Sequence, residues 1–139
     1  MSHWSAAGLL LVLGTVGACK TPKAHRPLEL APESMAQRTL ETRRFDTGDE
    51  IKLLRAGLMI FQDEGFQLTE MEADLGVIAG IRPYFPHAVS LVSRPIAGNA
   101  NVLSVRVTFH FGKRLTDETI YRDFFSRLSK ALSIEGQSL

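Results

Sequence analysis

The chain has 139 residues, which suits one domain with attachments rather than two domains. Its composition, 45% hydrophobic and 22% charged, is typical of a globular protein. The formal net charge of +1, from 16 basic and 15 acidic residues, argues against nucleic acid as a partner, and the single cysteine excludes an internal disulfide.

The first feature along the chain is an uncharged stretch, residues 6–18, which reads AAGLLLVLGTVGA. Its 13 residues are too few to cross a bilayer, which takes roughly 20 residues. The length instead fits the apolar core of a secretory signal. A general secretory signal or an uncleaved anchor stays open as an alternative, because residues 1–5 carry no Lys or Arg.

The end of this stretch, VGAC at residues 16–19, resembles the bacterial lipobox. The resemblance implies a signal peptide over residues 1–18, cleavage between Ala18 and Cys19, and a diacylglycerol group on the thiol of Cys19. Such an anchor is durable, since each buried methylene contributes about 0.8 kcal/mol. Lys20 stands where an aspartate retains enteric lipoproteins at the inner membrane, so the resemblance implies a periplasm-facing location at the outer membrane.

Residues 19–37 are predicted to form a flexible linker that begins at the lipidated cysteine. They contain three prolines, scattered charge and no apolar periodicity. The linker would hold a globular domain, residues 38–139, away from the membrane surface.

The domain is expected to open with a strand over residues 39–45, followed by a helix. Thr47 and Glu50 have the spacing of a capping box at the start of that helix. Apolar residues then recur with helical spacing, and Gly65 supplies the stop. The apolar face consists of Ile51, Leu53, Leu54, Gly57, Leu58, Ile60 and Phe61.

Sheet segments are predicted for the middle of the domain. A hairpin begins at residues 66–68, turns at residues 73–76 and returns with Val77, Ala79 and Ile81. Pro83 and Pro86 mark a loop, and residues 87–94 form the next segment. Residues 102–111 alternate most cleanly between apolar and polar side chains, which predicts an antiparallel sheet with one face in water.

The last predicted element is a helix over residues 116–133, with Thr116 or Asp117 as its N-cap. Its apolar stripe consists of Ile120, Phe124, Leu128 and Leu132. Two amphipathic helices and a sheet with one wet face predict an α+β fold. We expect a two-layer sandwich, an antiparallel sheet with both helices packed on one face, in the order β-α-β-β-β-β-α.

Several segments together resemble a group of small bacterial outer-membrane lipoproteins. They are FDT at residues 45–47, FQDEGF at 61–66, LGVI at 75–78, SRP at 93–95, VRVTF at 105–109, and IY, FF and LS within 120–129. The layout is also similar, more distantly, to the helix-on-sheet domains of the C lipoprotein in the β-barrel assembly machine. The chain departs from the group after Phe109, where only HFGKRL precedes the last helix, so a function that needs a longer hairpin there is not implied.

Residues that carry catalytic chemistry are not arranged in a known motif, so we expect no enzyme, no cofactor and no metal. His87 and His110 lack the spacing of metal ligands and are interpreted as exposed or half-exposed side chains. Acidic residues gather before the first helix, where we interpret them as caps rather than an acid–base pair, and in the hairpin, where we favour a solvated edge over a calcium site. These residues are Asp46, Asp49, Glu50, Glu70, Glu72 and Asp74.

Candidate partner contacts lie on the loop between the prolines and on the open face of the sheet. Tyr84 and Phe85 are candidate interface anchors, although burial under the edge of the sheet fits them equally. Arg94 and Arg106 are the charged candidates. With Arg82 they would form a basic patch if their strands are neighbours, and the simpler interpretation is that they keep the open face soluble.

These expectations lead to one leading function and one alternative. The leading hypothesis is a non-catalytic outer-membrane lipoprotein that acts as an accessory or interaction subunit of an envelope assembly or transport system. Its partners would be an envelope protein and, through the lipid, the membrane, with no nucleic acid. The alternative is a lipid- or small-ligand-binding envelope lipoprotein, with a cavity lined by Leu54, Leu58, Phe124 and Leu128.

Overall fold

The structure, a computed structural model, describes residues 32–136. Residues 1–18, Cys19 and most of the predicted linker lie outside this part of the chain. The elements are α1 (Pro32–Glu41), β1 (Thr42–Phe45), α2 (Glu50–Asp63), β2 (Gln67–Glu72), the 3₁₀ turn η1 (Ala73–Leu75), β3 (Val77–Arg82), β4 (His87–Ile96), β5 (Asn99–Phe111), β6 (Lys113–Arg114) and α3 (Glu118–Gly136).

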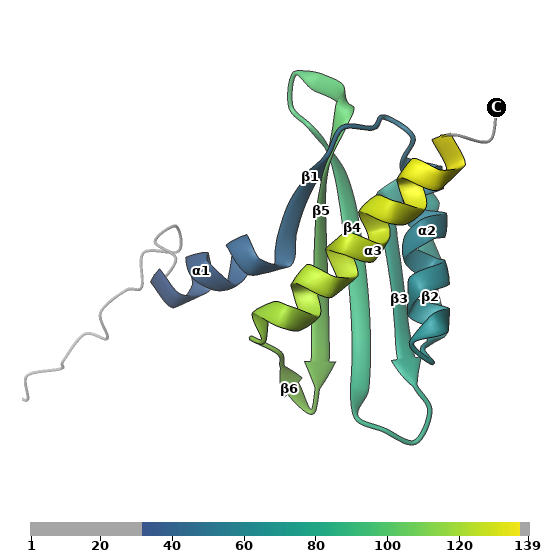
Figure 1. The fold of residues 1–139 in the computed structure, drawn as a ribbon. Helices are drawn as coiled ribbons and strands as arrows, with labels where there is room; N and C mark the ends of the chain where they lie inside the picture. Colours follow the sequence, from purple (N-terminus) through teal and green to yellow (C-terminus); the bar gives the residue numbers. More distant parts are fainter. Residues whose placement is uncertain (1–31, 137–139) are drawn as a thin grey trace, which may run out of the picture.

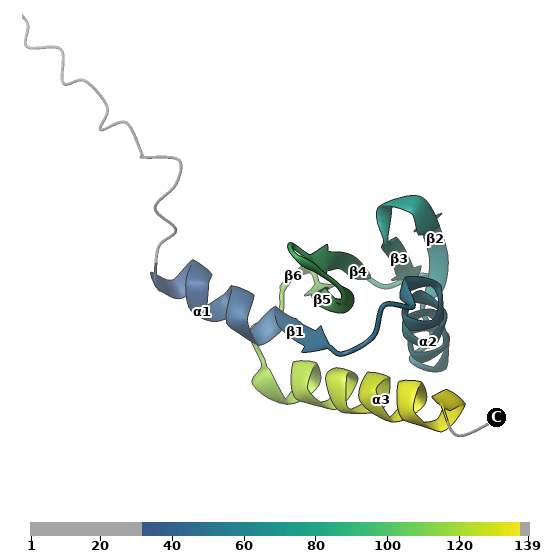
Figure 2. The same cartoon turned by 90° about the horizontal axis from the view of Figure 1, so that it is seen from above.

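The predicted α+β sandwich is confirmed. The strands form one antiparallel sheet in the order β1-β5-β4-β3-β2, and the short β6 pairs with β5 (Figure 1). Seen from above, α2 and α3 lie on the same side of this sheet, while α1 extends from its β1 edge (Figure 2). In the described part of the chain, none of the helices is long and apolar enough to cross a membrane.

The boundary between the predicted linker and the domain was wrong. Residues 32–37, assigned to the linker, belong to α1. This helix continues through the first three residues of the predicted first strand, which begins only at Thr42. Pro32 suits the first helical position, and Glu33 and Arg38 lie at the ends that favour their charges. The sequence did not predict this helix because it contains only two large apolar residues, Met35 and Leu40.

Helix α2 begins and ends at identifiable residues. Its N-cap is Asp49, whose Oδ1 accepts a hydrogen bond from the backbone N–H of Lys52 at 3.0 Å, so the predicted capping box was misplaced. Thr47 instead accepts from the N–H of Asp49. The predicted stop at Gly65 is confirmed: its φ is +83°, and the Gly65 and Phe66 N–H groups bond back to the last helical turn.

The core lies between the two helices and the sheet. Strand β5 alternates as predicted, with Leu103, Val105 and Val107 almost fully buried. The alternation of β3 differs, because Ile78 is buried and Ile81 is 46% exposed. Apolar residues stand on both faces of β3, so its sequence does not tell which face meets the helices.

Candidate functional site

The loop between β3 and β4 carries the most exposed aromatic side chains of the described residues. Tyr84 is fully exposed and Phe85 is 62% exposed, and we call these two residues the aromatic tip. The N–H of Phe85 donates to the carbonyl of Arg82 at 3.3 Å, which closes a turn with Pro83 second and Tyr84 third. Tyr84 has a φ of +66°, a conformation that normally favours glycine at that position. Of the two arrangements left open by the sequence, the structure shows the exposed one.

A stack of rings supports the base of the aromatic tip. The ring centroids of Phe85 and His87 lie 5.4 Å apart, and those of His87 and Phe111 lie 4.1 Å apart. Both pairs are stacked, with interplanar angles of 21° and 25°. The guanidinium carbon of Arg82 lies 5.6 Å from the Phe111 ring and 4.6 Å from the Phe66 ring. The loop is therefore fixed at its base, and Tyr84 projects beyond it.

A groove opens beside this stack, where the helix layer meets the same end of the sheet. We call it the end groove; its volume is about 320 Å³. Its walls come from α2, α3, β5 and the β3 end. The lining residues are Ile60, Glu64, Phe66, Arg82, Phe109, Phe111, Thr119, Ile120, Asp123, Phe124 and Arg127. Because Arg82 and Phe111 belong both to the groove and to the stack, the groove and the aromatic tip form one continuous surface.

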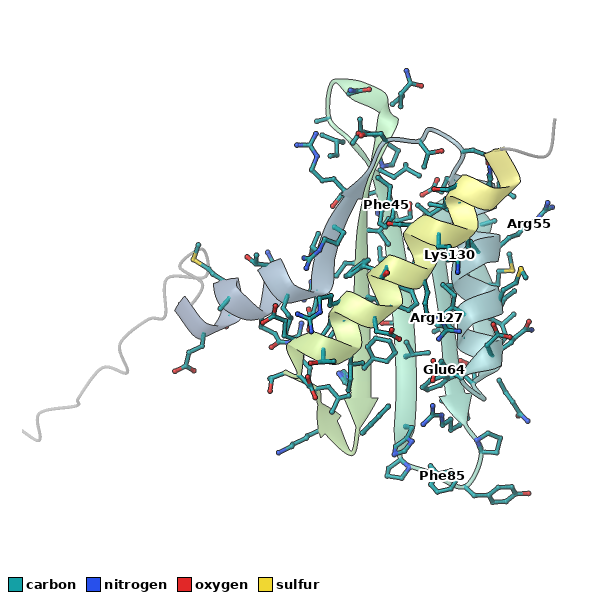
Figure 3. The ribbon with its side chains drawn as sticks, viewed as in Figure 1. Phe45, Arg55, Glu64, Phe85, Arg127 and Lys130 are labelled. Atoms are coloured by element: carbon teal, nitrogen blue, oxygen red, sulfur yellow. The ribbon has the colours of Figure 1, made fainter. Side chains whose placement is uncertain are left out.

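Ion pairs occupy one rim of the end groove. Glu64 accepts from Arg127, and its other oxygen lies 3.6 Å from Arg82. Arg127 also lies 3.5 Å from Asp63. In Figure 3, Glu64 and Arg127 lie beside each other, above the loop that carries Phe85. Asp123 is different: its side chain is exposed, and its carboxylate has no hydrogen-bond or ion-pair partner among the described residues.

Arg106, a candidate partner contact, is paired with a buried carboxylate, that of Glu41. Glu41 at the end of α1 is fully buried and accepts from Arg106 at 2.9 and 3.0 Å, from Arg114, and from Gln37 at 2.9 Å. Burial acts to raise the pKa of Glu41, but the hydrogen bonds from Arg114, Gln37 and Arg106 outweigh it and hold that pKa below its ordinary value. The hydrogen bond between Arg114 and Glu41 in turn raises the pKa of Arg114.

The basic patch proposed for Arg82, Arg94 and Arg106 is absent from the described structure. Arg82 lines the end groove, and Arg106 pairs with Glu41. Arg94 is exposed and donates to the carbonyl oxygens of Leu75 and Ser93. The three guanidinium groups therefore have separate local partners rather than a common ligand.

The histidines and acidic residues singled out from the sequence do not converge. His87 lies in the ring stack and His110 is exposed on β5. Within residues 32–136, no three His, Cys, Asp or Glu side chains are grouped so that they would hold a metal ion. Of the acidic residues before α2, Asp49 is confirmed as a cap.

The cavity expected for a ligand-binding protein is not where the sequence placed it. Leu54 and Leu128 are fully buried in the packed core, and Leu58 packs against that core from its margin. Only Phe124 of the predicted lining reaches the end groove. Sequence reasoning missed the groove because its walls come from segments far apart in the chain.

No protein-family model matches the chain, and no curated protein matches it.

Proposed function

We propose that this chain is a non-catalytic lipoprotein of the bacterial outer membrane that faces the periplasm. Its domain serves as an accessory or interaction subunit of an envelope assembly or transport system. The lipobox-like end of the apolar stretch supports the anchor. The contact with the protein partner is the aromatic tip.

The exposed, strained position of Tyr84 is the observation that carries this proposal. A non-glycine residue with φ near +66° costs of order 1–3 kcal/mol and persists where the surroundings fix it. Exposing two neighbouring aromatic rings is also unfavourable in water. Aromatic residues on a rigid support are typical anchors of protein interfaces, because little side-chain entropy is lost when they bind.

The end groove supports a second candidate, a lipid- or small-ligand-binding lipoprotein. Its volume of about 320 Å³ falls at the lower end of small-molecule sites, which span about 300–1,000 Å³. Six of its eleven lining residues are apolar, which suits an apolar ligand.

Chemical crosslinking in intact cells, followed by capture of the tagged protein and mass spectrometry, tests the leading proposal. We expect a stoichiometric envelope protein that is lost in the Tyr84→Ala/Phe85→Ala variant. Leu75→Ala is the matched control. Leu75 is 60% exposed, close to the value for Phe85, but it lies in the turn between β2 and β3, at the other end of β3. Recovery of the same partner with the double variant would show that the aromatic tip is not the contact.

The anchor is tested separately through Cys19. We expect Cys19→Ser to release the protein from membrane fractions while the domain keeps its thermal unfolding transition, because the described core is built from residues 45–128. Membrane retention equal to that of the wild type would contradict the proposed lipidation.

A further inference from the structure

We infer that the end groove binds a segment of the protein partner that combines an apolar side chain with a neighbouring Lys or Arg side chain. This inference rests on the proposed function, for which it names the chemistry of the partner. It places a second contact next to the aromatic tip.

The lining of the end groove favours an apolar side chain. Six of the eleven lining residues are apolar, and two of these, Phe111 and Ile120, are only half-buried, so a ligand meets carbon surface there. The volume of about 320 Å³ lies at the lower end of the range for small-molecule sites. It therefore suits one or two side chains of a bound segment better than a large cofactor or a many-chain lipid.

The rim selects a positive charge beside that apolar group. Both cations that line the groove, Arg82 and Arg127, are already engaged by Glu64, and Arg127 also by Asp63. Asp123 is the lining carboxylate with no partner among the described residues. A Lys or Arg of the partner would pair with Asp123, whereas a carboxylate would have to displace an existing ion pair.

The position of the groove favours a protein segment over a separate ligand. Arg82 and Phe111 join the groove to the ring stack beneath the aromatic tip. A partner that holds Tyr84 therefore passes directly over the groove. Burying an anchor and filling an adjacent pocket is how small interfaces gain most of their affinity.

Short capped dipeptides test the selection for both features. The full chain carrying Cys19→Ser is titrated with acetyl-Phe-Lys-amide, acetyl-Phe-Glu-amide and acetyl-Ala-Lys-amide, and binding is followed by NMR shifts of the backbone amides. We expect the Phe-Lys peptide to shift amides of residues 119–124 and to bind roughly two- to fivefold more tightly than the Phe-Glu peptide, since an exposed ion pair contributes little. The Ala-Lys peptide is expected to bind more weakly still.

Two variants separate the rim from the rest of the surface. Asp123→Asn is expected to abolish the preference for Lys over Glu, and Asp123→Lys to reverse it. Asp46→Asn is the matched control, because Asp46 is also exposed but lies beside Phe45 at the other end of α3.

Three results would overturn the inference. The first is equal binding of the Lys and Glu peptides by the wild type, and the second is a set of shifts that map away from residues 119–124. The third comes from a titration with decanol, a probe for an acyl chain. It is saturation of the groove by decanol with equal affinity in the wild type and Asp123→Asn, without competition from the Phe-Lys peptide. The last result would identify an acyl chain as the occupant. Each would leave the crosslinking result at the aromatic tip unchanged, so failure of the groove is distinguishable from failure of the proposed function.

Discussion

Tyr84 adopts a backbone conformation that a residue with a β-carbon reaches only at an energetic cost. Its φ of +66° is suited to glycine, and its side chain is fully exposed. Packing within the domain therefore does not explain why a tyrosine stands there. A role in binding does, because the ring is presented at the end of a supported loop.

Replacing Tyr84 with glycine separates stability from binding. We expect Tyr84→Gly to leave the free energy of unfolding unchanged or raise it by up to about 1 kcal/mol, because the left-handed conformation no longer carries strain. Partner capture should nevertheless fall. Urea unfolding and the crosslinking assay measure the two effects, and a clear loss of stability would assign Tyr84 a structural role.

Ser93 is a buried polar residue whose hydroxyl does not stabilise the fold. It is fully buried, and its hydroxyl has no hydrogen-bond partner among the described residues. We expect Ser93→Ala to be neutral or to stabilise the domain by about 1 kcal/mol, because an unsatisfied buried hydroxyl is removed. Ser90→Ala, on the same strand but half-buried, is the control in denaturant unfolding. A loss above about 1 kcal/mol for Ser93→Ala would contradict this account.

At the scale of elements, one buried carboxylate of α1 pairs with two strands of the sheet. Glu41 collects the guanidinium groups of Arg106 on β5 and Arg114 on β6, and it lies where the helix passes into β1. Such a cluster is difficult to foresee, because Glu41 is 65 and 73 residues from the two arginines and none of the three shows a distinctive local pattern. The periodic elements α2, β5 and α3 were predictable, since each carries its own apolar face.

Neutralising Glu41 should destabilise the domain. We expect Glu41→Gln to lower the free energy of unfolding by about 3 kcal/mol, the low end for a broken buried pair, because both arginines reach solvent. Glu33→Gln, on the exposed first turn of the same helix, should change it by less than about 0.5 kcal/mol. Urea unfolding compares the two, and equal effects would contradict the role of Glu41.

The same cluster sets the direction of a pH dependence. Because the folded-state pKa of Glu41 lies below its ordinary value of 4.5, its contribution to stability is fully present above that pH. The contribution is lost as the pH falls through the lowered folded-state pKa. The difference in stability between the wild type and Glu41→Gln should therefore shrink as the pH falls below 4.5, and a constant difference would exclude this linkage.

For the molecule as a whole, the two candidate contacts share one end of the domain. The aromatic tip and the end groove lie at the end of the sheet where β3 and β5 end, while α1 leaves the sheet at its β1 edge (Figure 1). The sequence pointed to Tyr84 and Phe85 through the flanking prolines. It did not reveal the groove, whose walls are assembled from α2, β3, β5 and α3, nor the engagement of Arg106 by Glu41.

The most direct test of the central claim is photo-crosslinking from position 84 in intact cells. A benzophenone amino acid is placed at residue 84 and, as the control, at residue 75. We predict a single major crosslink from position 84 to an envelope protein, and none to that protein from position 75. If position 84 crosslinks only to lipid, or if both positions give the same products, the aromatic tip is not a specific protein contact and the account is contradicted.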